Sequence, residues 1–110
     1  MAIEVKKKNK NLTELAIQGE ITIYTALEQK NALYEYLQNT KELQIDLSGV
    51  DELDSAGLQI LLFMKREAAE HQIKFSLTQH SQAVVEVFEL LDLSKHFGDP
   101  IVLSANWKQS

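Results

Sequence analysis

The chain has 110 residues, of which 45% are hydrophobic and 25% are charged, and it contains no cysteine. This is the composition of one globular domain, and without cysteine it can form neither disulfides nor zinc-thiolate sites, nor perform thiol catalysis. A net charge of -5 argues against nucleic acid as the main ligand, because neutralising phosphates needs clustered Lys and Arg. We expect a single domain over residues 1–110 that needs no metal and no cofactor.

The first residues do not resemble a secretion signal. Lys6, Lys7 and Lys8 follow a short alternating run, and no apolar segment comes after them. The longest apolar run, Ile60 to Met64, is far shorter than the ~20 residues that cross a bilayer. We therefore expect no membrane insertion and a cytoplasmic location, and we interpret the lysines as the solvated end of a hairpin rather than a phosphate-binding patch.

Alternation of apolar and polar residues predicts a hairpin at the start of the chain, with strands around 3–5 and 15–21 and a turn at 8–11. The next segment is predicted to be a helix over about 25–38, where Thr25 and Glu28 have the spacing of a capping box. The apolar face predicted for this helix consists of Ala26, Leu27, Leu33, Tyr34 and Leu37.

A strand with one covered face is predicted at about 43–47, and a loop over 48–54 then leads to Ser55. Next come a helix over 56–71, a strand over 73–77 and a third helix capped by Ser81. The apolar face of the third helix holds Val84, Val85, Phe88 and Leu91, and after Asp99-Pro100 residues 101–103 are a candidate last strand.

This order of elements predicts an α/β fold. Strand–helix–strand crossovers require parallel neighbours, so we expect a mixed sheet of four to five strands with the helices packed mainly on one face. The second helix is apolar almost all round near its start. We interpret it as buried between sheet and helices, with a partly exposed docking patch that includes Met64 as the alternative.

The segment from Asp46 to Leu58 places four acids, two serines and two glycines at a strand–helix junction. Ser55 is interpreted as an N-cap whose hydroxyl satisfies an orphan amide of the helix. The free amides and partial positive charge of a helix start would equally well hold a phosphate on Ser55.

Four neighbours of Ser55 are open to more than one interpretation. Gly57 costs up to ~1 kcal/mol against alanine in the first turn, and this is explained either by close approach of a partner or kinase to the exposed backbone or by tight packing against the preceding loop. Asp54 either favours the helix start electrostatically or holds the Ser55 loop for a kinase. Asp51 and Glu52 are interpreted as a solvated acidic edge.

No enzyme site is recognisable. His71, His80 and His96 lack a metal-ligand spacing, and neither a nucleophile elbow nor a phosphate-binding glycine loop occurs. We therefore expect no catalytic activity.

The run Asp54-Ser55-Ala56-Gly57-Leu58 after a strand resembles the signature of STAS domains (sulfate transporter and anti-sigma-factor antagonist) of the antagonist type. Gly19-Glu20-Ile21 followed by Thr25-Ala26 resembles an earlier segment of that family. Ser81-Gln82-Ala83-Val84 with Phe88 and Leu93 resembles its third-helix region, so the resemblance spans nearly the whole chain.

The resemblance implies partner switching. The unphosphorylated protein would bind an anti-sigma factor and free its sigma factor; that anti-sigma factor would be a serine kinase acting on Ser55, and a PP2C-type phosphatase would reverse the reaction. Thr22 stands where many members carry Asp, which puts the contact made there in doubt. The expected state is a monomer or weak dimer. The residues implied in partner binding are Glu20, Thr22, Asp54, Ser55, Ala56 and Gly57.

Two other roles are compatible with the same fold. One is a STAS subunit of a phospholipid-transport ABC system, which needs no phosphorylation cycle, and the other is a scaffold in a chemosensory cluster. The serine within Asp-Ser-Ala-Gly favours the switch.

Overall fold

The strands and helices follow one another in the predicted order. A computed structural model describes residues 2–91, so the predicted strand at 101–103, Asp99-Pro100, Leu93 and His96 lie outside the described residues. The elements are β1 (Ala2–Lys8), β2 (Leu12–Ile21), α1 (Ala26–Gln38), β3 (Glu42–Leu53), α2 (Ser55–Glu70), β4 (Lys74–Thr78) and α3 (Gln82–Leu91).

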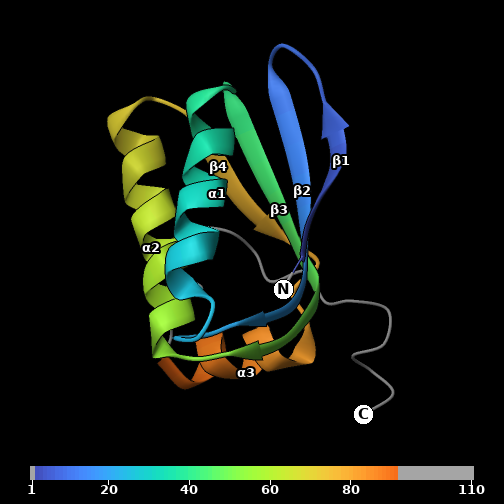
Figure 1. The fold of residues 1–110 in the computed structure, drawn as a ribbon, viewed down its shortest axis with the longest axis vertical. Coiled ribbons are helices and arrows are strands. Elements are labelled where there is room, and N and C mark those ends of the chain that lie inside the picture. Colours follow the sequence, from blue (N-terminus) through green and yellow to red (C-terminus); the bar gives the residue numbers. More distant parts are fainter. Residues whose placement is uncertain (1, 92–110) are drawn as a thin grey trace.

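The strands form one mixed sheet of four strands in the order β1-β2-β3-β4 (Figure 1). β1 and β2 are an antiparallel hairpin, and its turn is closed by Asn9 Oδ1, which accepts hydrogen bonds from the backbone N–H groups of Asn11 and Leu12 at 2.9 Å each. β3 is parallel to β2, and β4 is parallel to β3, because a helix connects each pair. The predicted α/β fold with a mixed sheet is confirmed, with four strands in the described part of the chain.

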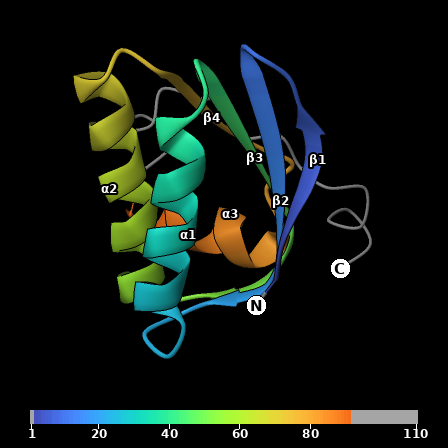
Figure 2. The ribbon, with the colours of Figure 1, turned by 45° about the horizontal axis from the view of Figure 1, so that its top comes forward.

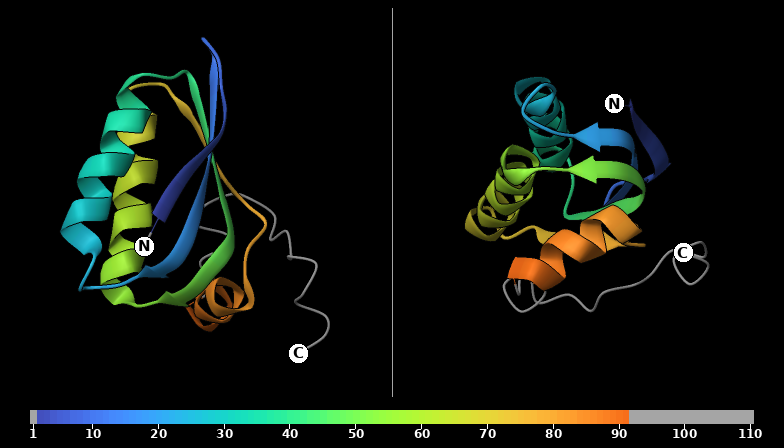
Figure 3. Two further views of the ribbon diagram at one scale, coloured as in Figure 1. Left: turned by 45° about the vertical axis from the view of Figure 1, so that its right-hand side comes forward. Right: turned by 90° about the horizontal axis from the view of Figure 1, so that it is seen from below.

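The helices α1 and α2 lie side by side over one face of the sheet (Figures 1 and 2), and Figure 3 shows the sheet nearly edge-on. α3 crosses the end of the sheet and packs mainly on β3. Burying each Leu or Ile side chain stabilises the fold by about 1.5–3 kcal/mol. The core side chains with no exposed surface include Leu15, Ile17, Leu33, Leu43, Ile45, Leu47, Leu61, Met64 and Val84.

Among the predicted face residues whose burial the structure describes, which leaves out Ala26 and Leu91, the helical patterns are right with one exception. α2 is buried through Leu58, Ile60, Leu61, Met64 and Ala68, which confirms the interpretation of a helix packed between sheet and neighbour. The face predicted for α1 is wrong at Leu27. Leu33 and Leu37 are buried and Tyr34 is half-buried, but Leu27 is 73% exposed because, with 3.6 residues per turn, it lies about 100° around the helix from the direction shared by Leu33 and Leu37.

The predicted loop over 48–54 is wrong, since β3 continues to Leu53. β2 pairs with β3 as far as Ile21 opposite Leu53, and Val50 and Leu53 are buried in the core. The register shifts once just before Gln18 and again just after Gly19. Gly19 has a φ of 95°, which only glycine adopts readily, so this residue allows β2 to bend and follow β3 to its end.

β1 is an edge strand with a positively charged surface. Lys7 and Lys8 are exposed, as the solvated hairpin end predicts, and the pairing with β2 shifts between Val5 and Lys7. Lys6 instead reaches across β2 to Asp46 on β3, with 2.8 Å between Lys6 Nζ and Asp46 Oδ2. Burial raises the pKa of Asp46, but hydrogen bonds from Lys6 and Ser48 outweigh it, so the pKa lies below the usual value.

Candidate functional site

The candidate site lies where two helices begin at the same end of the sheet. β2 and β3 end next to each other, β2 leads through a short turn into α1, and β3 leads directly into α2 (Figure 3, right). The parallel arrangement therefore brings the β2–α1 turn, residues 22–25, beside Ser55 although about thirty positions of sequence separate them.

Asp54 fastens these two segments together. It is the N-cap of α2, and its Oδ1 accepts a hydrogen bond from the N–H of Gly57 at 2.9 Å. Its Oδ2 accepts one from the N–H of Ile23, in the β2–α1 turn, also at 2.9 Å. The hydrogen bonds from Gly57 and then Ile23 lower the pKa of Asp54 below its usual value, so the carboxylate is the stable form. Both interpretations of Asp54 hold in part, because it favours the helix start and also holds the loop next to Ser55.

Ser55 is the first residue of α2, not its cap. The prediction that Ser55 caps a helix beginning at Ala56 is therefore wrong, because the carboxylate of Asp54 performs the capping. The Ser55 side chain is exposed and has no hydrogen-bond partner among the described residues. Its hydroxyl lies in solvent at the start of a helix and supports no other part of the described fold.

Gly57 is buried in the first turn of the helix, while Ala56 beside it is half-buried. A Cβ at position 57 would collide with the backbone carbonyl of Ile21 and come within 2.9 Å of Leu53 Cδ1. Of the two explanations for this glycine, the structure favours tight packing. The approaching backbone, however, belongs to β2 and not to the preceding loop.

Glu20 and Thr22 take part in a hydrogen-bond network at the end of β2. Thr22 is only 3% exposed, and its Oγ1 donates to Glu20 Oε1 at 3.1 Å. The N–H of Thr22 donates to Thr25 Oγ1, and the buried Gln29 donates from Nε2 to the Glu20 carbonyl at 2.8 Å. Thr25 Oγ1 is thus engaged within the turn and makes no cap bond to α1, so the predicted capping box with Glu28 is wrong.

Three side chains of this region are exposed where sequence reasoning did not predict it. Ile23, Tyr24 and Leu27 are 67%, 90% and 73% exposed, although residues of these types are usually covered. For Ile23 and Tyr24 a signal exists in the sequence. Both fall between the end of the β2 alternation and the start of the helical pattern, where no core position is expected.

The interpretation of an acidic edge is confirmed. Asp51 and Glu52 are exposed, and Glu52 pairs in register with Glu20 on the neighbouring strand. Residues 20–29 and 50–60 together carry five carboxylates and neither Lys nor Arg. The surroundings of Ser55 are therefore negatively charged.

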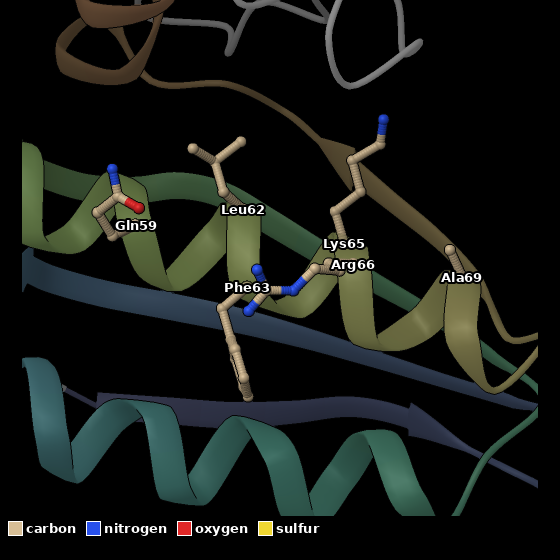
Figure 4. Close-up of a pocket in the computed structure, with 6 residues that line it drawn as sticks. All are labelled: Gln59, Leu62, Phe63, Lys65, Arg66 and Ala69. Atoms are coloured by element: carbon tan, nitrogen blue, oxygen red, sulfur yellow. The ribbon is translucent and has the colours of Figure 1, made fainter.

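The outward face of α2 changes character away from Ser55. Gln59, Leu62, Phe63, Lys65, Arg66 and Ala69 line an open depression there (Figure 4). Lys30 Nζ lies 4.5 Å and the Arg66 guanidinium carbon 5.9 Å from the centre of the Phe63 ring, within the range of cation–π contacts. The helix thus follows the acidic residues Asp51, Glu52 and Asp54 and has a basic, aromatic middle.

In residues 2–91, no group of His, Asp and Glu side chains is arranged to hold a metal ion. Among the helices of that same part, none is both long and apolar enough to span a bilayer.

Comparison with known proteins gives consistent matches. The family model described as "Mlab, STAS domain" matches residues 5–103. The anti-sigma-B factor antagonist of Listeria monocytogenes is 32% identical over 97 residues, covering 86% of this chain and 83% of that protein. The anti-sigma-F factor antagonist RsfB of Mycobacterium tuberculosis is 33% identical over 84 residues, covering 76% of this chain and 68% of that protein.

A solved structure agrees with these relatives. The crystal structure of an anti-sigma factor antagonist from Mycobacterium paratuberculosis superposes with a TM-score of 0.75 at 25% identity, covering 96% of this chain and 89% of that one. The family model spans nearly the whole chain, and the fold agrees with that of the solved antagonist. The chain therefore belongs to the STAS domain family.

Proposed function

We propose that this protein is an anti-sigma-factor antagonist that works by partner switching and is controlled by phosphorylation of Ser55. Two relatives more than 30% identical carry the name anti-sigma factor antagonist, and each is covered over two thirds or more of its length. The proposed partners are an anti-sigma factor that is also a serine kinase, and a PP2C-type phosphatase.

The observation that carries the proposal is the freedom of the Ser55 hydroxyl. Among the serines and threonines of residues 2–91, only Ser48 and Ser55 are exposed; Thr22 and Ser81 are buried. Asp54 caps α2, so modification of Ser55 removes no structural hydrogen bond. The phosphorylated and the unphosphorylated protein can therefore have the same fold.

Charge and burial determine whether phosphorylation strengthens or weakens binding of the anti-sigma factor. A phosphate adds about -1.5 to -2 charges to a region that already carries five carboxylates. A kinase that phosphorylates Ser55 holds its nucleotide phosphates opposite this residue, so phosphoserine would face negative charge in the complex. Burying a dianion there also costs its hydration. Phosphorylation should release the anti-sigma factor.

The test uses the chain as bait in extract of its source organism. Ser55→Ala should capture an ATP-binding anti-sigma factor, Ser55→Asp should capture it weakly, and the wild-type chain should lose it after incubation with ATP. Ser48→Ala is the matched control, because Ser48 is the other exposed serine, and it should behave as wild type. Mass spectrometry should find the phosphate on Ser55.

Phosphate on Ser48 with Ser55 unmodified would refute the site. Equal capture by Ser55→Ala, Ser55→Asp and wild type would refute the switch and favour a constitutive role. A transporter ATPase or a chemoreceptor component in place of the anti-sigma factor would identify the phospholipid-transport subunit or the chemosensory scaffold instead.

A further inference from the structure

The β2–α1 turn and the first turn of α1 carry most of the large exposed apolar side chains of the described chain. Five such side chains of residues 2–91 are exposed, and three of them, Ile23, Tyr24 and Leu27, fall within five positions of sequence. The other two, Val5 and Leu90, are isolated on β1 and α3. Single exposed apolar residues need no explanation, whereas a gathered set usually marks an interaction surface. We call Ile23, Tyr24 and Leu27 the apolar patch.

The backbone beneath the apolar patch is held in place. The N–H of Ile23 donates to Asp54 Oδ2 at 2.9 Å, and the N–H of Thr25 donates to the Thr22 carbonyl at 3.0 Å. Gln29, one turn further along α1 and 1% exposed, anchors the helix to the Glu20 carbonyl. In Figure 2 the turn projects beyond the starts of both helices. A fixed, projecting turn loses little conformational entropy when a partner covers it, which suits a docking element.

The apolar patch is tied to Ser55 through one residue. Asp54 precedes Ser55 in the chain and holds Ile23 by a hydrogen bond, so the patch and the hydroxyl belong to one surface at the helix starts. The carboxylates around this surface are Glu20, Glu28, Asp51, Glu52 and Asp54, with no Lys or Arg in residues 20–29 or 50–60. A complementary partner has an apolar depression bordered by basic residues.

We propose that the apolar patch is the main apolar anchor for the anti-sigma factor, which covers Ile23, Tyr24, Leu27 and Ser55 in one interface. This assignment rests on the proposed function and adds the surface that supplies affinity. Aromatic and large aliphatic side chains in the centre of an interface carry most of the binding energy. The phosphorylation state of Ser55, at the border of the apolar patch, then determines whether the anti-sigma factor docks, while the apolar patch determines the affinity of the complex.

The test compares exposed apolar residues inside and outside the patch. Leu27→Ser and Tyr24→Ser are made in the Ser55→Ala chain, with Leu90→Ser as the matched control, since Leu90 is 83% exposed on α3. Affinity for the purified anti-sigma factor captured by Ser55→Ala is measured by calorimetry, and thermal unfolding checks each variant. Each patch variant should weaken binding at least tenfold with unchanged unfolding, and Leu90→Ser should stay within twofold.

Wild-type affinity in both patch variants, with Ser55→Asp still weakening binding, would overturn the patch while leaving the proposed function intact. Loss of self-association in Leu27→Ser without loss of anti-sigma factor binding would also overturn it, because the patch would then contact a second copy of this chain. If Ser55→Ala captures no anti-sigma factor, the proposed function fails, and this assignment fails with it.

Discussion

The two helices that begin at the same end of the sheet begin in different ways. α2 follows β3 after one residue, Asp54, whose side chain caps it. α1 follows β2 after a turn of four residues, and Thr25 at its start makes no cap bond from its side chain. The turn before α1 is instead fastened to the other helix start, through the hydrogen bond between Ile23 and Asp54.

The contrast between the two helix starts explains how the site is built. The start of α2 is determined by its own cap and by contact of Gly57 with the β2 backbone. The turn before α1 presents exposed apolar side chains and depends on a carboxylate that lies far away in sequence. A change at the start of α2 should therefore disturb both segments, whereas a change at the start of α1 should stay local.

The greatest loss of stability is expected at Gly57. Because the backbone of Ile21 leaves no space for a Cβ, Gly57→Leu should lower the free energy of unfolding by about 3 kcal/mol, and Gly57→Ala by a smaller amount. Urea denaturation measures both. Gly49→Ala is the matched control, since its Cβ would meet the movable side chain of Gln18 and should cost much less. If Gly57→Leu were as stable as wild type but bound its partner poorly, the glycine would instead be explained by close approach of a partner.

Asp54→Ala should have the next largest effect. It removes the α2 cap and the link to Ile23, so it should cost about 2 kcal/mol. Thr25→Ala, at the start of α1, should cost less than about 1 kcal/mol, because its hydroxyl serves only the turn and the adjacent end of β2. Chemical denaturation of the two variants gives the ranking, and a larger loss in Thr25→Ala would contradict the proposed division of roles.

Acidification should remove the advantage that Asp54 provides. The pKa of Asp54 is lower in the folded chain than in the unfolded one, so the contribution is complete above about pH 4 and is lost as the pH falls through the folded value. The difference in unfolding free energy between wild type and Asp54→Ala should therefore shrink below about pH 4. A gap that stays constant far below about pH 4 would show that the charge is not involved.

The smallest effect is expected at Ser55. Since Asp54 is the cap, Ser55→Ala should change the unfolding free energy by less than about 0.5 kcal/mol. Ser81→Ala is the matched control, because Ser81 Oγ accepts a hydrogen bond from the N–H of Val84 at 3.3 Å and caps α3, so its loss should cost about 1 kcal/mol. Thermal unfolding compares the two variants, and an equal loss of stability in both would show that Ser55 does cap α2.

Features that local patterns determine could be predicted from the sequence. Period-two and helical alternation predict the order of the elements and the parallel crossovers, and the predicted cap at Ser81 is confirmed. At the start of α2, Asp54 and Ser55 are both good N-cap residues in adjacent positions, and propensity cannot choose between them. The choice depends on Ile23, which offers Asp54 a second hydrogen bond from another part of the chain.

The remaining errors have the same non-local origin. The predicted β3 is too short because the length of this strand is set by pairing with β2 up to Leu53, not by its own alternation. Leu27 is apolar like the core residues of α1, but the rest of the fold covers only the face that holds Leu33 and Leu37. Gly57 is recognisable as unusual, yet the carbonyl of Ile21 that excludes a side chain comes from a different strand.

The lysines and the register shift of β1 affect whether two molecules of this protein can associate through their sheet edges. An edge strand offers unpaired backbone groups on which a neighbouring chain can add its own strand, the first step of aggregation. Here that edge carries Lys6, Lys7 and Lys8, and the irregularity between Val5 and Lys7 interrupts its regular spacing. Two molecules approaching through their β1 edges would set like charges against each other, so this edge discourages intermolecular sheet growth at high concentration while the acidic surface at the helix starts stays accessible.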